Sequence, residues 1–260
     1  MIRGSSGVKL VFIDTHIVPT SFDFNSPSQD TIAIVGVDIL RAGTTLCFAL
    51  HNGAKEVIPA IDSNEAMTIY NRLDKEKVLL CGERNCFKIE GYHLDNSPYN
   101  YTSEVVQGKS LILNTTNGSF LFKKGVGIKN FFIGSFLNVS SLWKAILEQI
   151  KKDSSNRIVL ICAGNNFGFA YEDVIFCGCL IDLFKQSFVS NEDVYLNDAS
   201  IAAVELYQLH RNNLLDFIKT TYHSKMLIEL GFERDIDFAF EINKVSVVPV
   251  ANGFSFVGLI

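Results

Sequence analysis

Residues 31 to 45 read Thr31-Ile-Ala-Ile-Val-Gly-Val-Asp-Ile-Leu-Arg-Ala-Gly-Thr-Thr45. A seven-residue apolar run rich in β-branched side chains is followed at once by Asp38 and Arg41, and then by helical periodicity over Thr44–Asn52. Such a run predicts a strand buried on both faces, and the segment after it predicts a strand–turn–helix unit. Units of this kind are typical of a parallel sheet covered by helices.

The same alternation continues along the chain. Apolar runs predict further strands at Lys9–Ile13, Glu56–Ala60, Val78–Cys81, Ser110–Leu113, Asn130–Ile133, Arg157–Cys162 and Val245–Val250. Further helices are predicted at Asn64–Leu73, Val139–Lys151, Tyr171–Lys185 and Ser200–Asn212, with Gly53 and Gly231 placed to end helices. We predict a three-layer α/β/α fold with a largely parallel sheet. It forms one domain over residues 1–260, or two closely packed lobes, 1–135 and 136–260.

Composition narrows the class of protein. The chain has 260 residues, of which 48% are hydrophobic, and a formal net charge of -5. This charge argues against nonspecific attraction to nucleic acid or anionic lipid, which needs a basic face. The N-terminal residues lack the apolar run of a signal peptide, and no segment approaches the roughly 20 apolar residues of a membrane span. With six cysteines in no disulfide-scaffold spacing, we expect a cytoplasmic protein with reduced thiols.

Five predicted strands run directly into turns rich in polar residues or glycine. These turns are residues 37–45, 81–84, 113–118, 133–138 and 162–166. In a parallel sheet such turns share the carboxyl edge, where open α/β proteins bind ligands. The sequence therefore predicts a small-molecule site at the carboxyl edge of the strands.

The turn Thr115-Thr116-Asn117-Gly118 leads into a predicted helix. Its hydroxyls, its amide and the backbone N–H groups are suited to a phosphate at the positive end of a helix dipole. The alternative interpretation is that Thr and Asn only cap the helix and form the turn.

Carboxylates suggest a metal site near this turn. Mg²⁺ prefers oxygen ligands from one or two carboxylates plus water and substrate phosphate, and Asp38 with Glu172 or Asp173 meets that need. Arg41 is suited to bind an anionic group of the substrate. The alternatives are a capping Asp38 with a structural Arg41 ion pair, and acidic residues that only favour a helix dipole.

Two further residues have competing interpretations. Cys162 ends a strand, yet no Cys-x5-Arg loop follows it, so we expect a buried structural thiol. His223 is either a substrate contact or proton carrier, or a structural histidine. A nicotinamide oxidoreductase is disfavoured because no strand is followed by a glycine fingerprint.

Taken together, the ordered motifs resemble the 2-phosphosulfolactate phosphatase family. The resemblance runs from about residue 31 to Pro249 and rests on these segments: Asp38–Thr45, Asn52–Pro59, Gly82–Arg84, Lys88–Gly91, Asn96–Pro98, Thr115–Gly118, Gly134–Asn138, Cys162–Gly164, Glu172-Asp173, His223 and Leu230–Ile236. It implies Mg²⁺-dependent hydrolysis of (R)-2-phospho-3-sulfolactate to 3-sulfolactate and phosphate, a step of coenzyme M biosynthesis.

From the motifs and the resemblance we predict three sets of site residues. The catalytic set is Asp38, Arg41, Arg84 and Glu172. The substrate-binding set is Thr44, Thr45, Lys88, Thr115, Thr116, Asn117, Gly118, Ser135, Asn138 and His223. The Mg²⁺ ligands are drawn from Asp38, Glu83, Glu172 and Asp173, and either Asp38 or a metal-bound water is the nucleophile.

The chain also departs from the family pattern. Gly43 replaces a usual Ala, Asn85-Cys86 replaces a Gly pair, Ser224 replaces Gly, and Asn243 replaces a usual Asp. Two alternatives follow: a phosphatase of another 2-hydroxy acid phosphate, and, because of Asn243, a noncatalytic anion-binding protein of the same fold. The sequence does not fix the oligomeric state, although α/β enzymes of this size often form homodimers.

Overall fold

The computed structural model describes residues 10–152, 154–187 and 194–259. Its strands are β1 (Val11–His16), β2 (Thr31–Val37), β3 (Glu56–Pro59), β4 (Val78–Arg84), β5 (Phe87–Lys88), β6 (Ser110–Asn114), β7 (Phe131–Gly134), β8 (Arg157–Cys162), β9 (Val194–Leu196), β10 (Val248–Asn252) and β11 (Ser255–Leu259). Its α-helices are α1 (Ala42–His51), α2 (Ser63–Tyr70), α3 (Ser103–Val106), α4 (Gly118–Gly125), α5 (Val139–Lys152), α6 (Tyr171–Ser187), α7 (Asp198–His210), α8 (Leu214–Lys219), α9 (Tyr222–Glu229) and α10 (Glu233–Ala239). Three short 3-10 helices are η1 (Pro19–Ser21), η2 (Pro98–Asn100) and η3 (Phe136–Asn138).

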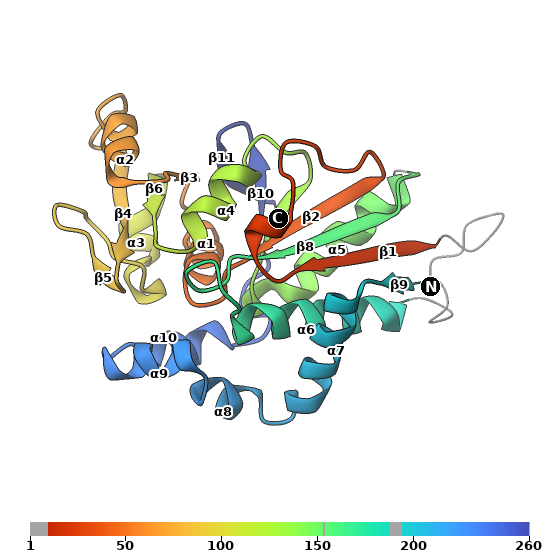
Figure 1. Cartoon of the computed structure of the whole chain (residues 1–260). Helices are drawn as coiled ribbons and strands as arrows, with labels where there is room; N and C mark the ends of the chain where they lie inside the picture. Colours follow the sequence, from red (N-terminus) through yellow and green to blue (C-terminus); the bar gives the residue numbers. More distant parts are fainter. Residues whose placement is uncertain (1–9, 153, 188–193, 260) are drawn as a thin grey trace.

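The strands form one sheet in the order β5-β4-β6-β3-β11-β10-β7-β2-β8-β1-β9. It contains two parallel blocks, β4-β6-β3 and β7-β2-β8-β1-β9, joined by the antiparallel hairpin β10–β11 (Figure 1). Three successive antiparallel pairings separate β3 from β7, so the two blocks run in opposite senses. The predicted, largely parallel α/β sheet is therefore confirmed. Its parallel strands, however, belong to two blocks that run in opposite directions.

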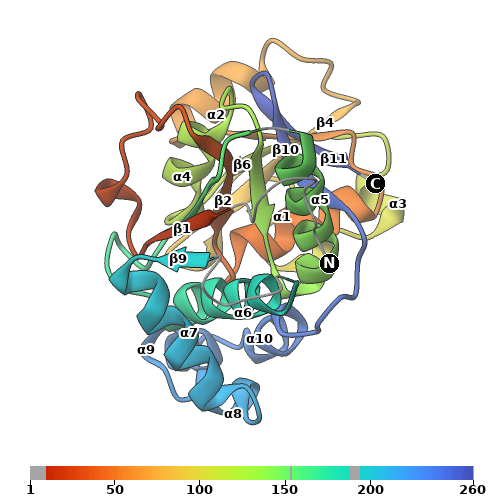
Figure 2. The ribbon, with the colours of Figure 1, turned by 90° about the vertical axis from the view of Figure 1, so that its right-hand side faces the viewer.

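Helices cover both faces of the larger block (Figures 1 and 2). Alternate residues of β2 enter different cores: Val35 packs in the cluster with α5 and α6, whereas Ile34 packs in the cluster with α1 and α4. β8 divides in the same way at Leu160 and Ile161. Side chains of a strand alternate between faces, so this division establishes the three predicted layers.

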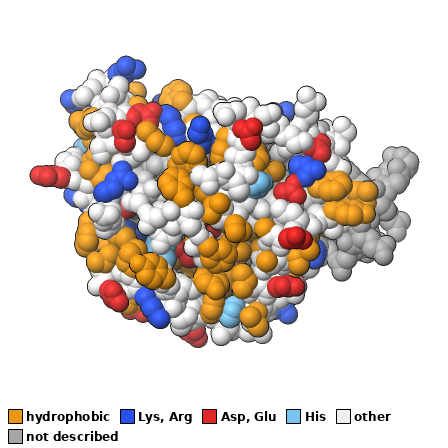
Figure 3. Space-filling view, in the orientation of Figure 1, with side chains coloured by type: hydrophobic (Ala, Val, Ile, Leu, Met, Phe, Trp, Pro, Cys, Tyr) orange, Lys and Arg blue, Asp and Glu red, His pale blue; other side chains and the backbone are white. Residues whose placement is uncertain are grey.

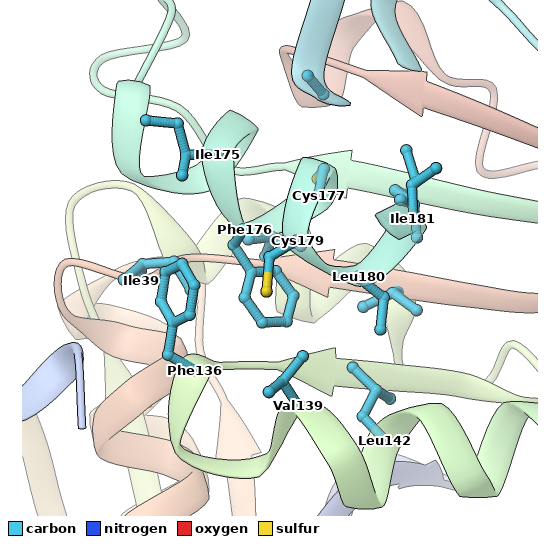
Figure 4. Packing of buried hydrophobic residues seen from close by; sticks show 14 of the residues in the cluster. Ile39, Phe136, Val139, Leu142, Ile175, Phe176, Cys177, Cys179, Leu180 and Ile181 are labelled. Atoms are coloured by element: carbon cyan, nitrogen blue, oxygen red, sulfur yellow. The ribbon is translucent and has the colours of Figure 1, made fainter. Parts of the chain in front are cut away.

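The packing of α6 shows how the helical layer is held. Figure 4 shows Phe176 and Leu180 of this helix pointing toward the start of α5. The ring of Phe176 meets that of Phe136 edge-on, with centroids 5.2 Å apart. Burial of such large side chains holds α6 in place against the sheet and α5. It thereby fixes the position of the first turn of α6, which carries Glu172 and Asp173.

Several sequence predictions about the rest of the chain are also tested. All six cysteines are buried and free, including Cys162. Among the described residues, none of the helices combines the length and apolarity needed to cross a membrane. On the face in Figure 3, Lys and Arg side chains are interspersed with Asp and Glu. Lys9, the first residue of the first predicted strand, lies outside the described residues.

Candidate active site

A cavity of about 370 Å³ opens where the carboxyl ends of the two blocks meet. It is lined by Asp38, Leu40, Arg41, Glu83, Asn85, Cys86, Phe87, Asn96, Thr115, Thr116, Asn117, Asn165, Asn166, His223, Met226, Leu227 and Leu230. The turns after β2 and β8 come from one block, and those after β4 and β6 come from the other. Four of the five predicted polar turns, two from each block, therefore line one cavity.

Asp38 lies between the N-termini of two helices. Its Oδ1 accepts a hydrogen bond from the N–H of Ala42, at the start of α1, over 3.0 Å. Its Oδ2 accepts no hydrogen bond from the described residues and lies against Gly118, the first residue of α4. Burial raises the pKa of Asp38 to about 7, and the charges of Glu83 and Glu172 add to this, although the Ala42 N–H and His223 oppose it. Asp38 thus offers the cavity a carboxylate oxygen with no protein partner.

Glu83 holds two turns together. Its Oε1 accepts from the N–H of Thr116 at 2.7 Å, and its Oε2 accepts from the Thr116 hydroxyl at 3.0 Å and from the N–H of Cys86 at 2.8 Å. The carboxylate therefore orients the Thr115–Gly118 turn. The Asn117 side chain does not cap α4; its Oδ1 accepts from the N–H of Asn166. For Asn117, the alternative of a plain helix cap is wrong.

His223 and Glu172 form a buried pair across two helix N-termini. The His223 Nδ1 and the Glu172 Oε1 are 2.6 Å apart, and the other Glu172 oxygen is buried with no partner in the described part of the chain. Burial lowers the pKa of His223, but the hydrogen bond to Glu172 and the charges of Glu172 and Asp38 outweigh it, so the pKa is raised. Asp173 faces elsewhere, since its two oxygens accept from the N–H groups of Ile39 and Gly164.

This pair predicts a pH dependence of stability. Because the pKa of His223 is higher in the folded chain than its ordinary value of 6.5, protonated His223 stabilises the fold fully below that pH. The contribution is lost as pH rises through the raised pKa. We expect the unfolding free energy of the wild type to exceed that of His223→Gln by less at pH 9 than at pH 6, measured with urea. A difference that stays constant between these two pH values contradicts the pairing, and exposed His51→Gln is the control.

Arg41 belongs to a hydrogen-bonded group with Cys86, Ser97 and Asp235. The Arg41 guanidinium donates to Asp235 Oδ2 at 2.7 Å and to the Cys86 carbonyl at 2.9 Å. It also stacks on the ring of Phe232, 4.2 Å from the centroid. The predicted structural ion pair of Arg41 is therefore present, and the same side chain lines the cavity.

The remaining predicted residues lie outside the cavity lining. Arg84 is exposed and donates to Asn114 Oδ1, and Lys88 is exposed on β5. The Thr44 hydroxyl contacts Ser135, and the Thr45 hydroxyl donates to the Asn96 carbonyl. The Asn138 amide donates to the Val247 carbonyl at 3.1 Å. Apart from Lys88, these side chains join elements together: Arg84, Thr44, Ser135, Thr45 and Asn138.

The cavity also contains residues outside the three predicted sets of site residues. They are Asn85, Cys86, Phe87, Asn96, Asn165, Asn166, Met226, Leu227 and Leu230, with Leu40. Three of them, Asn85, Cys86 and Asn166, have positive φ angles of 52°, 70° and 50°. Asn is the non-glycine residue that tolerates positive φ angles best. The Asn-containing turns were therefore the sequence feature that could have indicated these residues.

Asn243 lies away from this cavity. It has a φ of 59°, is exposed, and accepts through Oδ1 from the N–H of Ser140 in the first turn of α5. Asn suits both the left-handed conformation and the helix end. The feature that motivated a noncatalytic anion-binding protein is therefore a structural turn.

Comparison with known proteins gives one consistent result. The sequence model of the family described as 2-phosphosulpholactate phosphatase matches residues 19–253. A relative from Caldicellulosiruptor saccharolyticus is 40% identical over 220 residues, which cover 85% of this chain and 88% of the relative. A relative from Caldanaerobacter subterraneus subsp. tengcongensis is 39% identical over 239 residues, covering 92% and 95%, and one from Thermotoga maritima is 37% identical over 229 residues, covering 88% and 92%. Each of the three is named as a probable 2-phosphosulfolactate phosphatase.

Proposed function

The chain belongs to the 2-phosphosulpholactate phosphatase family, and from that membership we propose that it is a Mg²⁺-dependent phosphatase that hydrolyses 2-phospho-3-sulfolactate to 3-sulfolactate and phosphate. The observation that carries the proposal is the position of Asp38. Its unpartnered Oδ2 faces a cavity at the start of α4, where phosphate groups are favoured.

Helix N-termini favour an anion in this cavity. α1 and α4 begin against Asp38, and the first turns of α6 and α9 supply the Glu172–His223 pair. The N-terminus of each helix carries a partial positive charge. The N-termini of α1 and α4 beside Asp38 therefore support binding of a phosphate ester.

Charge balance supports a bound divalent cation. Four carboxylates are buried in the cavity lining or bonded to it, belonging to Asp38, Glu83, Glu172 and Asp235. The buried cationic side chains among the described residues are Arg41 and His223. A substrate with phosphate, carboxylate and sulfonate groups adds further negative charge. A cation that neutralises part of this charge stabilises the ionised carboxylates and also favours binding of the anionic substrate.

The donor set fits Mg²⁺ rather than a metal held by protein alone. Within the described ranges, no group of three or more His, Cys, Asp or Glu side chains is arranged to hold a metal. Mg²⁺ is commonly bound by one or two carboxylates together with water and substrate phosphate oxygens. Asp38 Oδ2, with Glu83 beside it, would hold it, and the ion would supply electrostatic stabilisation of the phosphoryl group.

The protein groups then have separate roles. The Thr115–Gly118 turn and the first turn of α4 bind the phosphate, and Arg41 binds a second acid group of the substrate. Glu83 keeps the phosphate-binding turn in place through its bonds to Thr116. From the resemblance we also propose that the protein acts in coenzyme M biosynthesis in the cytoplasm.

Phosphate release from a panel of 2-hydroxy acid phosphates tests the function. We expect release to be fastest with 2-phospho-3-sulfolactate and to fall by about tenfold or more when EDTA replaces Mg²⁺. Preference for an ester without a sulfonate would favour the phosphatase of another 2-hydroxy acid. The absence of release from every ester, with Mg²⁺ present, would contradict a phosphatase.

A further inference from the structure

The cavity contains an amide side chain that has no hydrogen-bond partner among the described residues. Asn96 lines the cavity and is 3% exposed, and its Oδ1 is buried without a hydrogen-bond partner. No described residue bonds to its Nδ2 either. Buried polar groups without partners are uncommon because they cost free energy comparable to a lost hydrogen bond. A bound ligand that pairs with the amide would explain why such a side chain lies here.

The backbone on both sides of this amide is firmly held. The Thr45 hydroxyl donates to the Asn96 carbonyl at 2.8 Å, and the N–H of Ser97 donates to Asp95 Oδ1 at 2.8 Å. The Tyr101 hydroxyl donates to the Asp95 carbonyl at 2.6 Å. Asn96 therefore presents its amide from a fixed position, which is the arrangement that lowers the entropic cost of binding a ligand.

Asn96 lies beside a cationic group. The Ser97 hydroxyl donates to Asp235 Oδ1 at 2.7 Å, and the other oxygen of Asp235 accepts from Arg41 at 2.7 Å. The segment that carries Asn96 is thus bonded to the same carboxylate that holds the Arg41 guanidinium. Both Asn96 and Arg41 line the cavity, so an amide donor and a guanidinium are available together.

We propose that Asn96 is a specificity-determining residue, whose amide Nδ2 donates to the acid group that the substrate carries apart from its phosphate, beside the Arg41 guanidinium. The inference rests on the proposed function and deepens it. The Oδ1 of Asn96 is the buried atom of the amide, so Nδ2 is the atom left to donate to a ligand in the cavity. The recognised group is a carboxylate or a sulfonate, which present similar oxygen acceptors.

Kinetics with matched substrates test this role. The substrates are 2-phospho-3-sulfolactate, 2-phospholactate, which lacks the sulfonate, and isopropyl phosphate, which lacks both acid groups. Since a hydrogen bond to a charged group is worth about 10- to 100-fold, we expect Asn96→Ala to raise KM for 2-phospho-3-sulfolactate by that factor, with kcat nearly unchanged. The effect should be absent with isopropyl phosphate.

2-Phospholactate, which keeps the carboxylate but lacks the sulfonate, identifies the acid group that Asn96 binds. If the effect of Asn96→Ala disappears with 2-phospholactate, the recognised group is the sulfonate, and if it persists there, the group is the carboxylate. Equal effects on all three substrates would overturn the proposal, because a structural role or a phosphate contact acts on every ester alike. Unchanged KM for every substrate would overturn it as well.

Two more variants guard against misfolding and nonspecific effects. Asn96→Asp keeps the size of the side chain and adds a negative charge, so it should raise KM for 2-phospho-3-sulfolactate more than for isopropyl phosphate. Asn100→Ala is the control, because its amide bonds Asp95 Oδ1 on the surface of the same segment.

Binding separates a failure of this inference from a failure of the proposed function. If the wild type hydrolyses none of the esters, the phosphatase proposal fails, and calorimetric titration with 3-sulfolactate still decides the role of Asn96. Binding weakened about tenfold or more in Asn96→Ala supports the proposal. Equal affinity, or no binding to the wild type, overturns it.

Discussion

Replacement of Asp38 by Asn is expected to lower kcat/KM for phosphate release by at least about 1,000-fold, with the fold intact. The amide oxygen can still accept from the N–H of Ala42, so the start of α1 keeps its hydrogen bond. The position of Oδ2, however, loses its charge. A neutral amide is a poor nucleophile and a weaker ligand for Mg²⁺, so both open roles of Asp38 are removed.

The same substitution should not destabilise the protein at alkaline pH. The pKa of Asp38 is raised to about 7 from an ordinary value of 3.8, first by burial. Between these values the folded state binds more protons than the unfolded state, so this group makes stability fall as pH rises. Above pH 7 the Asp38 carboxylate is charged while buried, which destabilises the folded state. The neutral amide of Asn removes this destabilisation. In EDTA at pH 8, we expect Asp38→Asn to have a Tm equal to or above that of the wild type.

Mg²⁺ provides a readout that does not need turnover. Binding to the folded state raises Tm, and the wild type should show this rise whereas Asp38→Asn should not. Asp216→Asn, at an exposed position of α8, is the matched control and should keep both activity and the Tm shift. Retained activity in Asp38→Asn would remove Asp38 from the mechanism.

Long apolar runs made most of the fold predictable. β2 and β8 have the predicted bounds because each is buried on both faces and ends at a polar turn. β5 and β9 have two and three residues, which is too short for a pattern. The opposed senses of the blocks depend on the β10–β11 hairpin, whose partners β3 and β7 lie more than a hundred residues earlier. Local periodicity carries no information about such pairing.

The site was partly predictable for a related reason. Polar residues directly after β2 and β6 line the cavity as expected, since strand ends fix their position. β4, however, continues through Arg84, and side chains of a strand alternate. Glu83 therefore faces inward, while Arg84 is exposed. Asn96 was missed as a site residue because no periodic pattern surrounds it and its neighbours come from α1 and α10.

The substitution Gly118→Ala is expected to lower kcat/KM by at least about 100-fold, because misplacement of a catalytic group by about 1 Å has an effect of this size. A Cβ at this position would lie 2.5 Å from Asp38 Oδ2 and 2.9 Å from the Ala42 Cβ. Asp38 is able to rotate away, so the stability loss should be smaller than the loss of activity. Alanine also favours helix more than glycine does, so a weaker α4 would not explain the result.

The control for this substitution is Gly253→Ala, in the β10–β11 hairpin. A Cβ there meets no atom within 4 Å, and its φ of +64° leaves only a backbone strain of about 1 kcal/mol. Activity should therefore be unchanged in this control, although its Tm falls slightly. In Gly118→Ala, the rise in Tm on addition of Mg²⁺ should shrink together with the activity, because one displaced carboxylate accounts for both. Near-normal activity in Gly118→Ala would show that turnover does not need Asp38 in the position seen against α4.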